Sequence, residues 1–412
     1  MGLLSLTMFG CATSSVDAPG RSSSGVSSDL FERQVMVTFP TTSHFLVRRS
    51  IQELSVTFEL RMVASWTMES LGQQCVVFEV PEIVAKRADA MDRLVQSLSR
   101  DHRIELAQRV QRFSTRNTLG AKTATNDGER SSYRRFQHAA DLLRLDAAHS
   151  LATGRGVRVA VIDTGMDLGH PEYGRRIVEA RDFVGRDQDS FTNDLHGTAV
   201  AGLIAARHDD GVGIVGVAPE ADLVAIKACW PEPAGGRRAV CNSYTLALAL
   251  DYAVSSEAEV INLSLGGPDD PILRRLVEAG LQRHTVVVAA NGGDGADFPA
   301  IVPGVLDVRA LPRPDEPREE TADLETTWLS APGHEILTTV PGGYDFWNGS
   351  SMAAAQVSGV AALLLEHRPD MTPEEVTILL RDSSRDNPGH GVVDACAAVS
   401  VVAGRACGQS GN

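Results

Sequence analysis

The feature that most constrains the fold is a series of four short apolar runs after residue 136. They are Val157–Ile162, Leu223–Ala228, Val260–Leu263 and Val286–Ala290. Such runs are typical of strands buried on both faces of a parallel sheet. Helical stretches lie between them, at Ala199–Ala206, Thr245–Val254 and Leu273–Gln282. Strands that alternate with helices predict an α/β fold with a doubly wound, mostly parallel sheet, and we assign it to residues 136–403.

A smaller α+β unit is predicted at residues 29–115. Gln34–Phe39 and Gln74–Val80 are rich in β-branched or aromatic residues and are bounded by prolines, as strands are. Ala85–Leu98 has helical periodicity, and a last strand is expected near Ile104–Val110. Residues 116–135 are polar and without an apolar period, so we read them as a linker, and residues 404–412 as a loose tail.

Composition excludes several classes of partner. The 412 residues are 43% hydrophobic, which is enough for one large domain and a smaller one. The formal net charge of -15 argues against nucleic acid, because phosphate binding needs concentrated Lys and Arg. No apolar run approaches the length of a membrane-spanning helix.

The N-terminus, residues 1–28, has two interpretations. The run Met8-Phe9-Gly10-Cys11 resembles a bacterial lipoprotein signal, in which Cys11 would be acylated, and a Ser/Gly/Pro-rich stretch follows it. No positive charge precedes the short apolar run, however, so a truncated or poorly ordered tail is the alternative. The first interpretation predicts a bacterial periplasmic or cell-envelope lipoprotein, and otherwise we expect a secreted protein.

The remaining cysteines suggest export. Cys229 and Cys241 bracket a Pro/Gly-rich loop, and Cys396 and Cys407 bracket the C-terminal end. An exported protein could bridge both pairs and leave Cys75 free. Pairing cannot be deduced from the sequence, so these bridges are a hypothesis.

Ser351 lies where a Gly-led polar turn enters a long apolar segment, Gln356–Leu365. The pattern predicts a buried helix that begins at or near this serine, which would place its hydroxyl among unpaired backbone N–H groups. Capping is the commonest role of such a serine. The alternative is a nucleophile.

Two further residues favour the nucleophile. Asp163 ends the first buried strand, and His196 lies at a Gly-marked turn that opens an Ala-rich helix. Serine catalysis requires a base for the hydroxyl and a carboxylate that orients the base. An aspartic protease is excluded, since Asp163-Thr164-Gly165 has no second copy.

At this point the chain resembles the subtilisin-like serine proteases, or subtilases, which share the order Asp, His, Ser. The resemblance spans residues 136–400. Its motifs are Val159–Gly165 followed by His170-Pro171, His196-Gly197-Thr198 with Val200-Ala201-Gly202, Gly213–Pro219, Asn262–Pro268 and Gly349–Ala354.

The resemblance implies roles for individual residues. Ser351 would be the nucleophile, His196 the general base and Asp163 its orienting partner, while His170 would be structural. Peptide-binding walls would be formed by Ser264, Leu265, Gly266 and Gly267 on one side and by Ala290, Asn291 and Gly292 on the other. Residues 29–115 would be a ferredoxin-like propeptide domain that assists folding and inhibits until it is cleaved.

The oxyanion region departs from the family pattern. Aligned without a gap, the usual asparagine position holds Gly293, and Asn291 stands two residues earlier. Losing one oxyanion donor lowers the rate about 10²- to 10³-fold. Asn291 could take over the role, catalysis could be slow, or the protein could be an inactive subtilase-fold protein that binds peptides.

We therefore expect a serine endopeptidase made as a zymogen, with polypeptide substrates and its own propeptide as partners. We expect a monomer, no nucleic-acid partner, and membrane contact only through a lipid anchor. The chemistry requires no cofactor. Many subtilases bind calcium, but no carboxylate loop in this sequence identifies a site.

Overall fold

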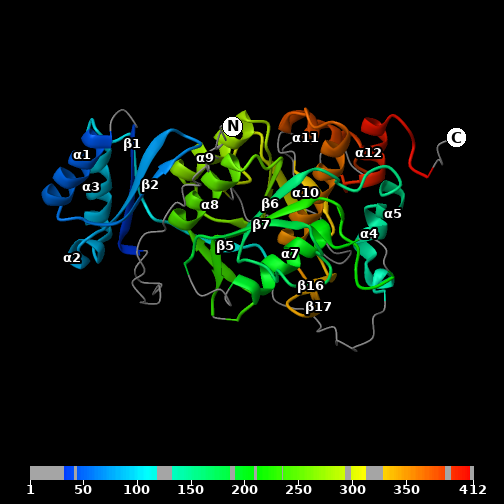
Figure 1. The fold of residues 1–412 in the computed structure, drawn as a ribbon. Helices are drawn as coiled ribbons and strands as arrows, with labels where there is room; N and C mark the ends of the chain where they lie inside the picture. The colour runs from blue at the N-terminus through cyan, green and yellow to red at the C-terminus, as the bar shows by residue number, and fades with distance from the viewer. Residues whose placement is uncertain are drawn as a thin grey trace, which may run out of the picture.

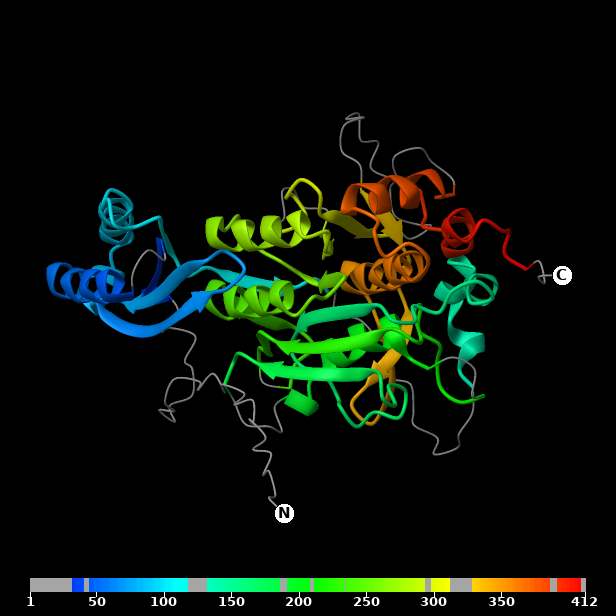
Figure 2. The ribbon, with the colours of Figure 1, turned by 45° about the horizontal axis from the view of Figure 1, so that its top comes forward.

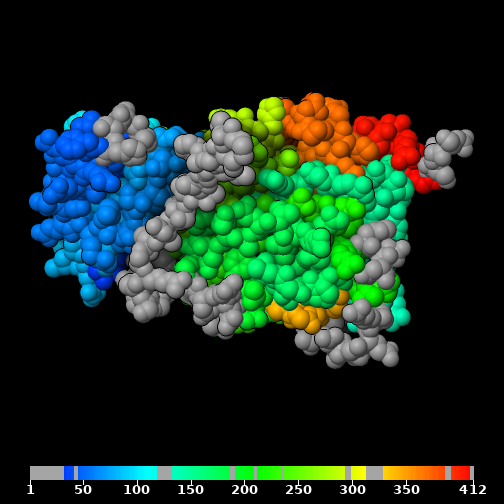
Figure 3. All heavy atoms as spheres, in the orientation of Figure 1, coloured from blue at the N-terminus to red at the C-terminus, as the bar shows by residue number. Residues whose placement is uncertain are grey.

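The computed structural model describes residues 32–40, 44–117, 132–185, 191–207, 211–233, 235–292, 298–311, 328–385 and 391–408. Two units lie side by side, a smaller one before residue 112 and a larger one after it (Figures 1 and 3). No described helix is long and apolar enough to cross a membrane.

The smaller unit is a four-stranded antiparallel sheet in the order β2-β3-β1-β4. Its strands are β1 (Gln34–Pro40), β2 (Arg61–Met68), β3 (Gln73–Glu79) and β4 (Leu106–Arg109), and its helices are α1 (His44–Thr57), α2 (Glu82–Ala85) and α3 (Ala88–Ser99). This βαββαβ order is ferredoxin-like. The sequence patterns predicted β1, β3, α3 and β4, but not α1 or β2.

Both faces of the small sheet are covered, and alternate residues of β1 divide between them. Val35 and Val37 face the unit's own core, whereas Met36 belongs to a core shared with the larger unit. That shared core includes Leu250 and Leu276, from two helices of the larger unit, α8 (Ser243–Ser255) and α9 (Pro271–Gln282). The small sheet therefore docks on these helices as on a continuation of the large core.

The larger unit is built on a seven-stranded parallel sheet in the order β15-β14-β13-β11-β6-β8-β7. These strands are β6 (Arg158–Asp163), β7 (Ile177–Asp182), β8 (Asp222–Lys227), β11 (Val260–Leu263), β13 (Val286–Ala290), β14 (Leu306–Ala310) and β15 (Leu329–Ala331). The predicted doubly wound α/β fold is confirmed.

Helices cover both faces of this sheet (Figure 2). On β6, Val159 and Val161 point to a core formed with α7 (Leu195–Ala205) and α10 (Ser350–His367), while Ala160 and Ile162 point to the core under α8 and α9. Short or peripheral elements complete the unit: α4 (His138–Leu142), α5 (Leu145–Ala148), α11 (Pro373–Asp382), α12 (Ala395–Ala403) and the hairpin β16 (Ile336–Val340) with β17 (Gly343–Trp347).

The chain reverses direction across the sheet between β6 and β11. The strands after β6 in sequence, β7 and β8, lie on one side of it, and β11, β13, β14 and β15 follow on the other. Ligand sites of doubly wound sheets form at the carboxyl ends of the strands at such a switch point. This edge is where Asp163 and Ser264 emerge.

Candidate active site

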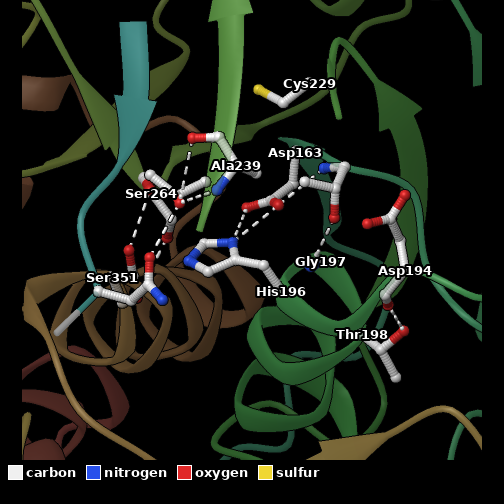
Figure 4. Close-up of polar contacts among 12 residues, drawn as sticks. Asp163, Asp194, His196, Gly197, Thr198, Cys229, Ala239, Ser264 and Ser351 are labelled. Carbon is white, nitrogen blue, oxygen red and sulfur yellow. Dashed lines mark hydrogen bonds and ion pairs between the residues drawn. The ribbon is translucent and has the colours of Figure 1, made fainter. Parts of the chain in front are cut away.

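Three elements bring the predicted catalytic side chains to this edge (Figure 4). Asp163 is the last residue of β6, His196 lies in the first turn of α7, and Ser351 is the second residue of α10. All three are at most 2% exposed. The helix predicted to begin at or near Ser351 is confirmed, as are both disulfides of the hypothesis, and Cys75 is a buried free thiol.

The Asp163 carboxylate holds one nitrogen of the His196 ring. Nδ1 of His196 lies 2.8 Å from Oδ1 and 2.9 Å from Oδ2 of Asp163, which places the proton on Nδ1. Nε2 is buried and makes no hydrogen bond within the described part of the chain. Figure 4 shows the ring between Asp163 and Ser351, with Nε2 on the Ser351 side. The geometry leaves Nε2 as the ring nitrogen that is not engaged by Asp163.

Close contact between β6 and α7 depends on a glycine. A Cβ added to Gly197 would lie 1.8 Å from the carbonyl oxygen of Gly165, so no larger residue fits without a backbone shift. The Gly197 N–H also donates to Thr164 Oγ1 at 3.0 Å. The glycine after His196 therefore sets the distance between the helix that carries the imidazole and the strand that carries the carboxylate.

Ser351 is held by hydrogen bonds to Ser264 and Arg116. Its Oγ donates to the Ser264 carbonyl oxygen at 3.0 Å, and Ser264 Oγ donates to the Ser351 carbonyl oxygen at 3.1 Å. The Ser351 N–H, at the start of α10, donates to the Arg116 carbonyl oxygen at 3.1 Å. An N–H at a helix start that faces a carbonyl oxygen is the kind of donor that stabilises a developing oxyanion.

Behind the triad lies a buried ion pair that the sequence did not predict. Lys227 ends β8 directly beside Asp163 in the sheet and donates from Nζ to Asp194 and to the Thr164 carbonyl oxygen. The ammonium is fully buried, and burial raises the pKa of Asp194 to about 6 in spite of that ammonium. The available signal was a lone Lys within the apolar run Leu223–Ala228.

Two strands pair with opposite edges of β5 (Arg112–Thr115), the segment that follows the small unit. One is β12 (Leu265–Gly266), which lies between Ser264 and Gly267 as predicted. The other, β10 (Ala239–Asn242), was not predicted; it pairs with β9 (Cys229–Pro231), and the Cys229–Cys241 disulfide joins the two. The cysteine spacing was the only sequence signal for this hairpin.

Ala290, Asn291 and Gly292, which were predicted for the opposite wall and the oxyanion region, are described. Ala290 is buried at the end of β13, and Gly292 is exposed just after it. Nδ2 of Asn291 donates to Asp307 Oδ2 at 3.0 Å, which ties this amide to β14. Gly293 lies outside the described residues, as does Cys11. The described residues contain no cluster of three His, Cys, Asp or Glu side chains suited to a metal.

Comparison with known proteins identifies the family of this chain. A sequence model described as the subtilase family matches residues 154–398. An intracellular serine protease of Paenibacillus polymyxa is 36% identical over 238 residues, which cover 54% of this chain and 71% of that protein. Subtilisin E of Bacillus subtilis is 34% identical over 245 residues, covering 57% of this chain and 62% of subtilisin E.

One solved structure is similar in fold to this chain over a longer part of the sequence than the family model matches. Fervidolysin from Fervidobacterium pennivorans, described as a keratinolytic enzyme related to subtilisin, matches with a TM-score of 0.66 at 24% identity, over 89% of this chain and 60% of its own. Because the family match covers more than half of the sequence, the chain belongs to the subtilase family and is a serine protease of the subtilisin type.

Proposed function

We propose that the protein is an endopeptidase that cleaves peptide bonds through an acyl-enzyme on Ser351. His196 acts as general base, and Asp163 keeps the imidazole in the tautomer that leaves Nε2 free. The observation that carries the proposal is the pair of contacts from His196 Nδ1 to both Asp163 oxygens, with the buried Nε2 on the Ser351 side.

In the proposed reaction, the Ser351 hydroxyl turns from the Ser264 carbonyl oxygen to Nε2 and transfers its proton as Oγ attacks the substrate carbonyl carbon. The Ser351 N–H donates to the oxygen as it becomes negative. The imidazolium, stabilised by Asp163, then protonates the leaving amine. Water, deprotonated by the same nitrogen, hydrolyses the acyl-enzyme and restores Ser351.

We propose further that the protein is made as a zymogen, with residues 29–115 as its propeptide. Two observations support this. The small sheet buries one face on α8 and α9, and β5, which follows it in sequence, lies between β12 and β10, the proposed walls of a peptide-binding cleft. A strand in that position excludes other peptides until it is released.

Export is proposed from the disulfides. Cys229–Cys241 and Cys396–Cys407 are both bridged, which is typical of proteins that fold in oxidising compartments. Acylation of Cys11 would add an anchor to the bacterial envelope. Metabolic labelling with a fatty-acid analogue, compared between the wild type and Cys11→Ser, tests the anchor.

A phosphonate probe that reacts with activated serines tests the catalytic proposal. After removal of the propeptide, the wild type is expected to be labelled on Ser351 and to cleave denatured protein, whereas Ser351→Ala does neither. A wild type that is folded but unlabelled and without proteolytic activity would contradict the proposed triad. The relatives do not support the inactive peptide-binding alternative, because the Paenibacillus polymyxa relative is named a serine protease.

A further inference from the structure

The segment after the small unit lies in the cleft as an extended peptide. On one side, Ser114 and Thr115 of β5 pair antiparallel with Gly266 and Leu265 of β12. On the other side, β5 pairs antiparallel with β10, with Ser114 opposite Val240. In Figure 4 the ribbon of this strand runs down to Ser351. Pairing on both sides fixes the register of the segment along the cleft.

This register presents one peptide bond to Ser351. The Arg116 N–H donates to the Ser264 carbonyl oxygen at 3.2 Å, and it also lies 3.1 Å from Ser351 Oγ. The Arg116 carbonyl oxygen accepts from the Ser351 N–H. A Cβ added to Gly349 would lie 2.3 Å from that oxygen and 2.6 Å from Cα of Asn117. The bond between Arg116 and Asn117 is therefore the one that lies over the start of α10.

The residue after this bond is also held. Asn117 Nδ2 donates to the Arg237 carbonyl oxygen at 2.9 Å, and Thr115 Oγ1 donates to Asn117 Oδ1 at 2.9 Å. Contacts on both sides of one bond fix it relative to the nucleophile, as near-attack geometry requires.

The Arg116 side chain packs against Gly266 of β12, a residue without a side chain. A Cβ added to Gly266 would come within 2.6 Å of Nε and 2.8 Å of Nη2 of Arg116. A planar guanidinium fits against a glycine backbone that any side chain would displace. The space beside Gly266 is therefore occupied by a long, flat, basic side chain in this structure.

A second anchor lies three residues earlier. Phe113 is 1% exposed, and its ring packs edge-on to Phe298 with the centroids 6.1 Å apart. A Cβ added to Gly267 would lie 2.4 Å from Cδ1 of Phe113. Consecutive glycines of the same wall therefore make room for the first and the fourth side chains before the bond.

We propose that the protein cleaves its own chain between Arg116 and Asn117, and that the peptides it cleaves afterwards share a basic residue before the bond and an aromatic residue three positions earlier. This inference rests on the proposed function. Ser351 Oγ bonds to the Arg116 carbonyl carbon, the bond to the Asn117 nitrogen breaks, and that nitrogen takes the proton from His196. Water then releases Arg116 as a free carboxylate.

The first test uses the full chain. Purified wild type is expected to yield a fragment that begins at Asn117 and another that ends at Arg116, by N-terminal sequencing and intact mass. The rate should not depend on protein concentration, because the bond already lies in the cleft. Arg116→Gln should slow this cut at least tenfold, whereas Arg48→Gln, the same charge change on the exposed surface of α1, should not.

The second test separates specificity from self-processing. Mature enzyme is offered the fluorogenic peptides Phe-Ser-Thr-Arg, Phe-Ser-Thr-Leu and Ala-Ser-Thr-Arg, each with an aminomethylcoumarin leaving group. We expect kcat/KM for the first to exceed the other two at least tenfold. Preference for the leucine peptide, or a new N-terminus elsewhere, overturns this inference while phosphonate labelling of Ser351 still supports the proposed function. Absence of both labelling and cleavage contradicts the two together.

Discussion

The buried pair Lys227–Asp194 gives the sharpest test of how this site is held together. Lys227 is 0% and Asp194 4% exposed, and the ammonium also binds the carbonyl oxygen of Thr164, the residue after Asp163. The change we consider is Lys227→Met, which keeps most of the buried volume and removes the charge. It leaves Asp194 as a buried carboxylate close to the carboxylate of Asp163.

Removing one member of a buried ion pair destabilises a protein by about 3–5 kcal/mol, since the partner's charge loses its compensation. We expect Lys227→Met to lower the free energy of unfolding by that amount. Lys227→Met with Asp194→Leu should return to within about 1 kcal/mol of the parent, because an apolar pair has no charge to compensate. The Asp194 side chain makes no capping hydrogen bond to α7, so its removal costs no helix cap.

The same change predicts the direction of a pH dependence. Burial already raises the pKa of Asp194 to about 6, and loss of the ammonium raises it further. A raised carboxyl pKa means that the folded state binds a proton that the unfolded state releases. The loss of stability in Lys227→Met therefore has its full size at pH values above the pKa of Asp194 in the variant. It becomes smaller as the pH falls toward about 6, where Asp194 of the parent also takes up a proton.

Urea denaturation in a Ser351→Ala background measures these differences without self-digestion, at pH 8.5 and at pH 6. The reasoning is refuted if Lys227→Met costs less than about 1 kcal/mol at pH 8.5, or if the double variant is less stable than the single one. A loss of equal size at the two pH values would refute the electrostatic explanation alone.

Three further outcomes are expected. Asp163→Asn should lower kcat about 10⁴-fold, because the amide favours the wrong imidazole tautomer, and a phosphonate probe should then label Ser351 correspondingly slowly. Removing the Cys229–Cys241 bridge should cost about 3 kcal/mol in urea and also raise KM for peptides, since the bridge holds β10, the proposed wall of the cleft. Removing Cys396–Cys407, which closes a loop of similar length, should lower stability only. Gly197→Ala should destabilise the protein by about 3 kcal/mol or more, because its Cβ would clash with the Gly165 carbonyl oxygen. The control Gly156→Ala, at a positive φ with open space around it, should cost about 1–2 kcal/mol. Equal losses in the two variants would argue against the contact with Gly165.

Local patterns in the sequence were enough for the fold class and for four of the seven strands of the large sheet. Buried parallel strands appear as continuous apolar runs, so β6, β8, β11 and β13 were predicted from the residues alone. The small-residue segment after Ser351 predicted α10, which packs against strands and a second helix. The candidate triad was found because each of its residues adjoins such an element and matches a family motif.

Elements with weaker local patterns were missed. Helix α1 leaves Phe45, Leu46 and Val56 exposed, so its apolar residues do not follow a single face. Strand β2 alternates poorly, with its first three residues exposed. Both elements depend on neighbours in the small sheet, and a neighbour's contribution is not visible in a short window of sequence.

The sequence by itself determined the fold class, the candidate triad and the resemblance to the family, because these follow from hydrophobic period and from residues near one another in the chain. Only the tertiary structure decided that Arg112–Thr115 also pairs with β10, and that Lys227 faces Asp194. The physical reason is that strand pairing and the compensation of a buried charge are contacts between distant segments. Their free energy depends on which surfaces meet after folding, and no local pattern records it.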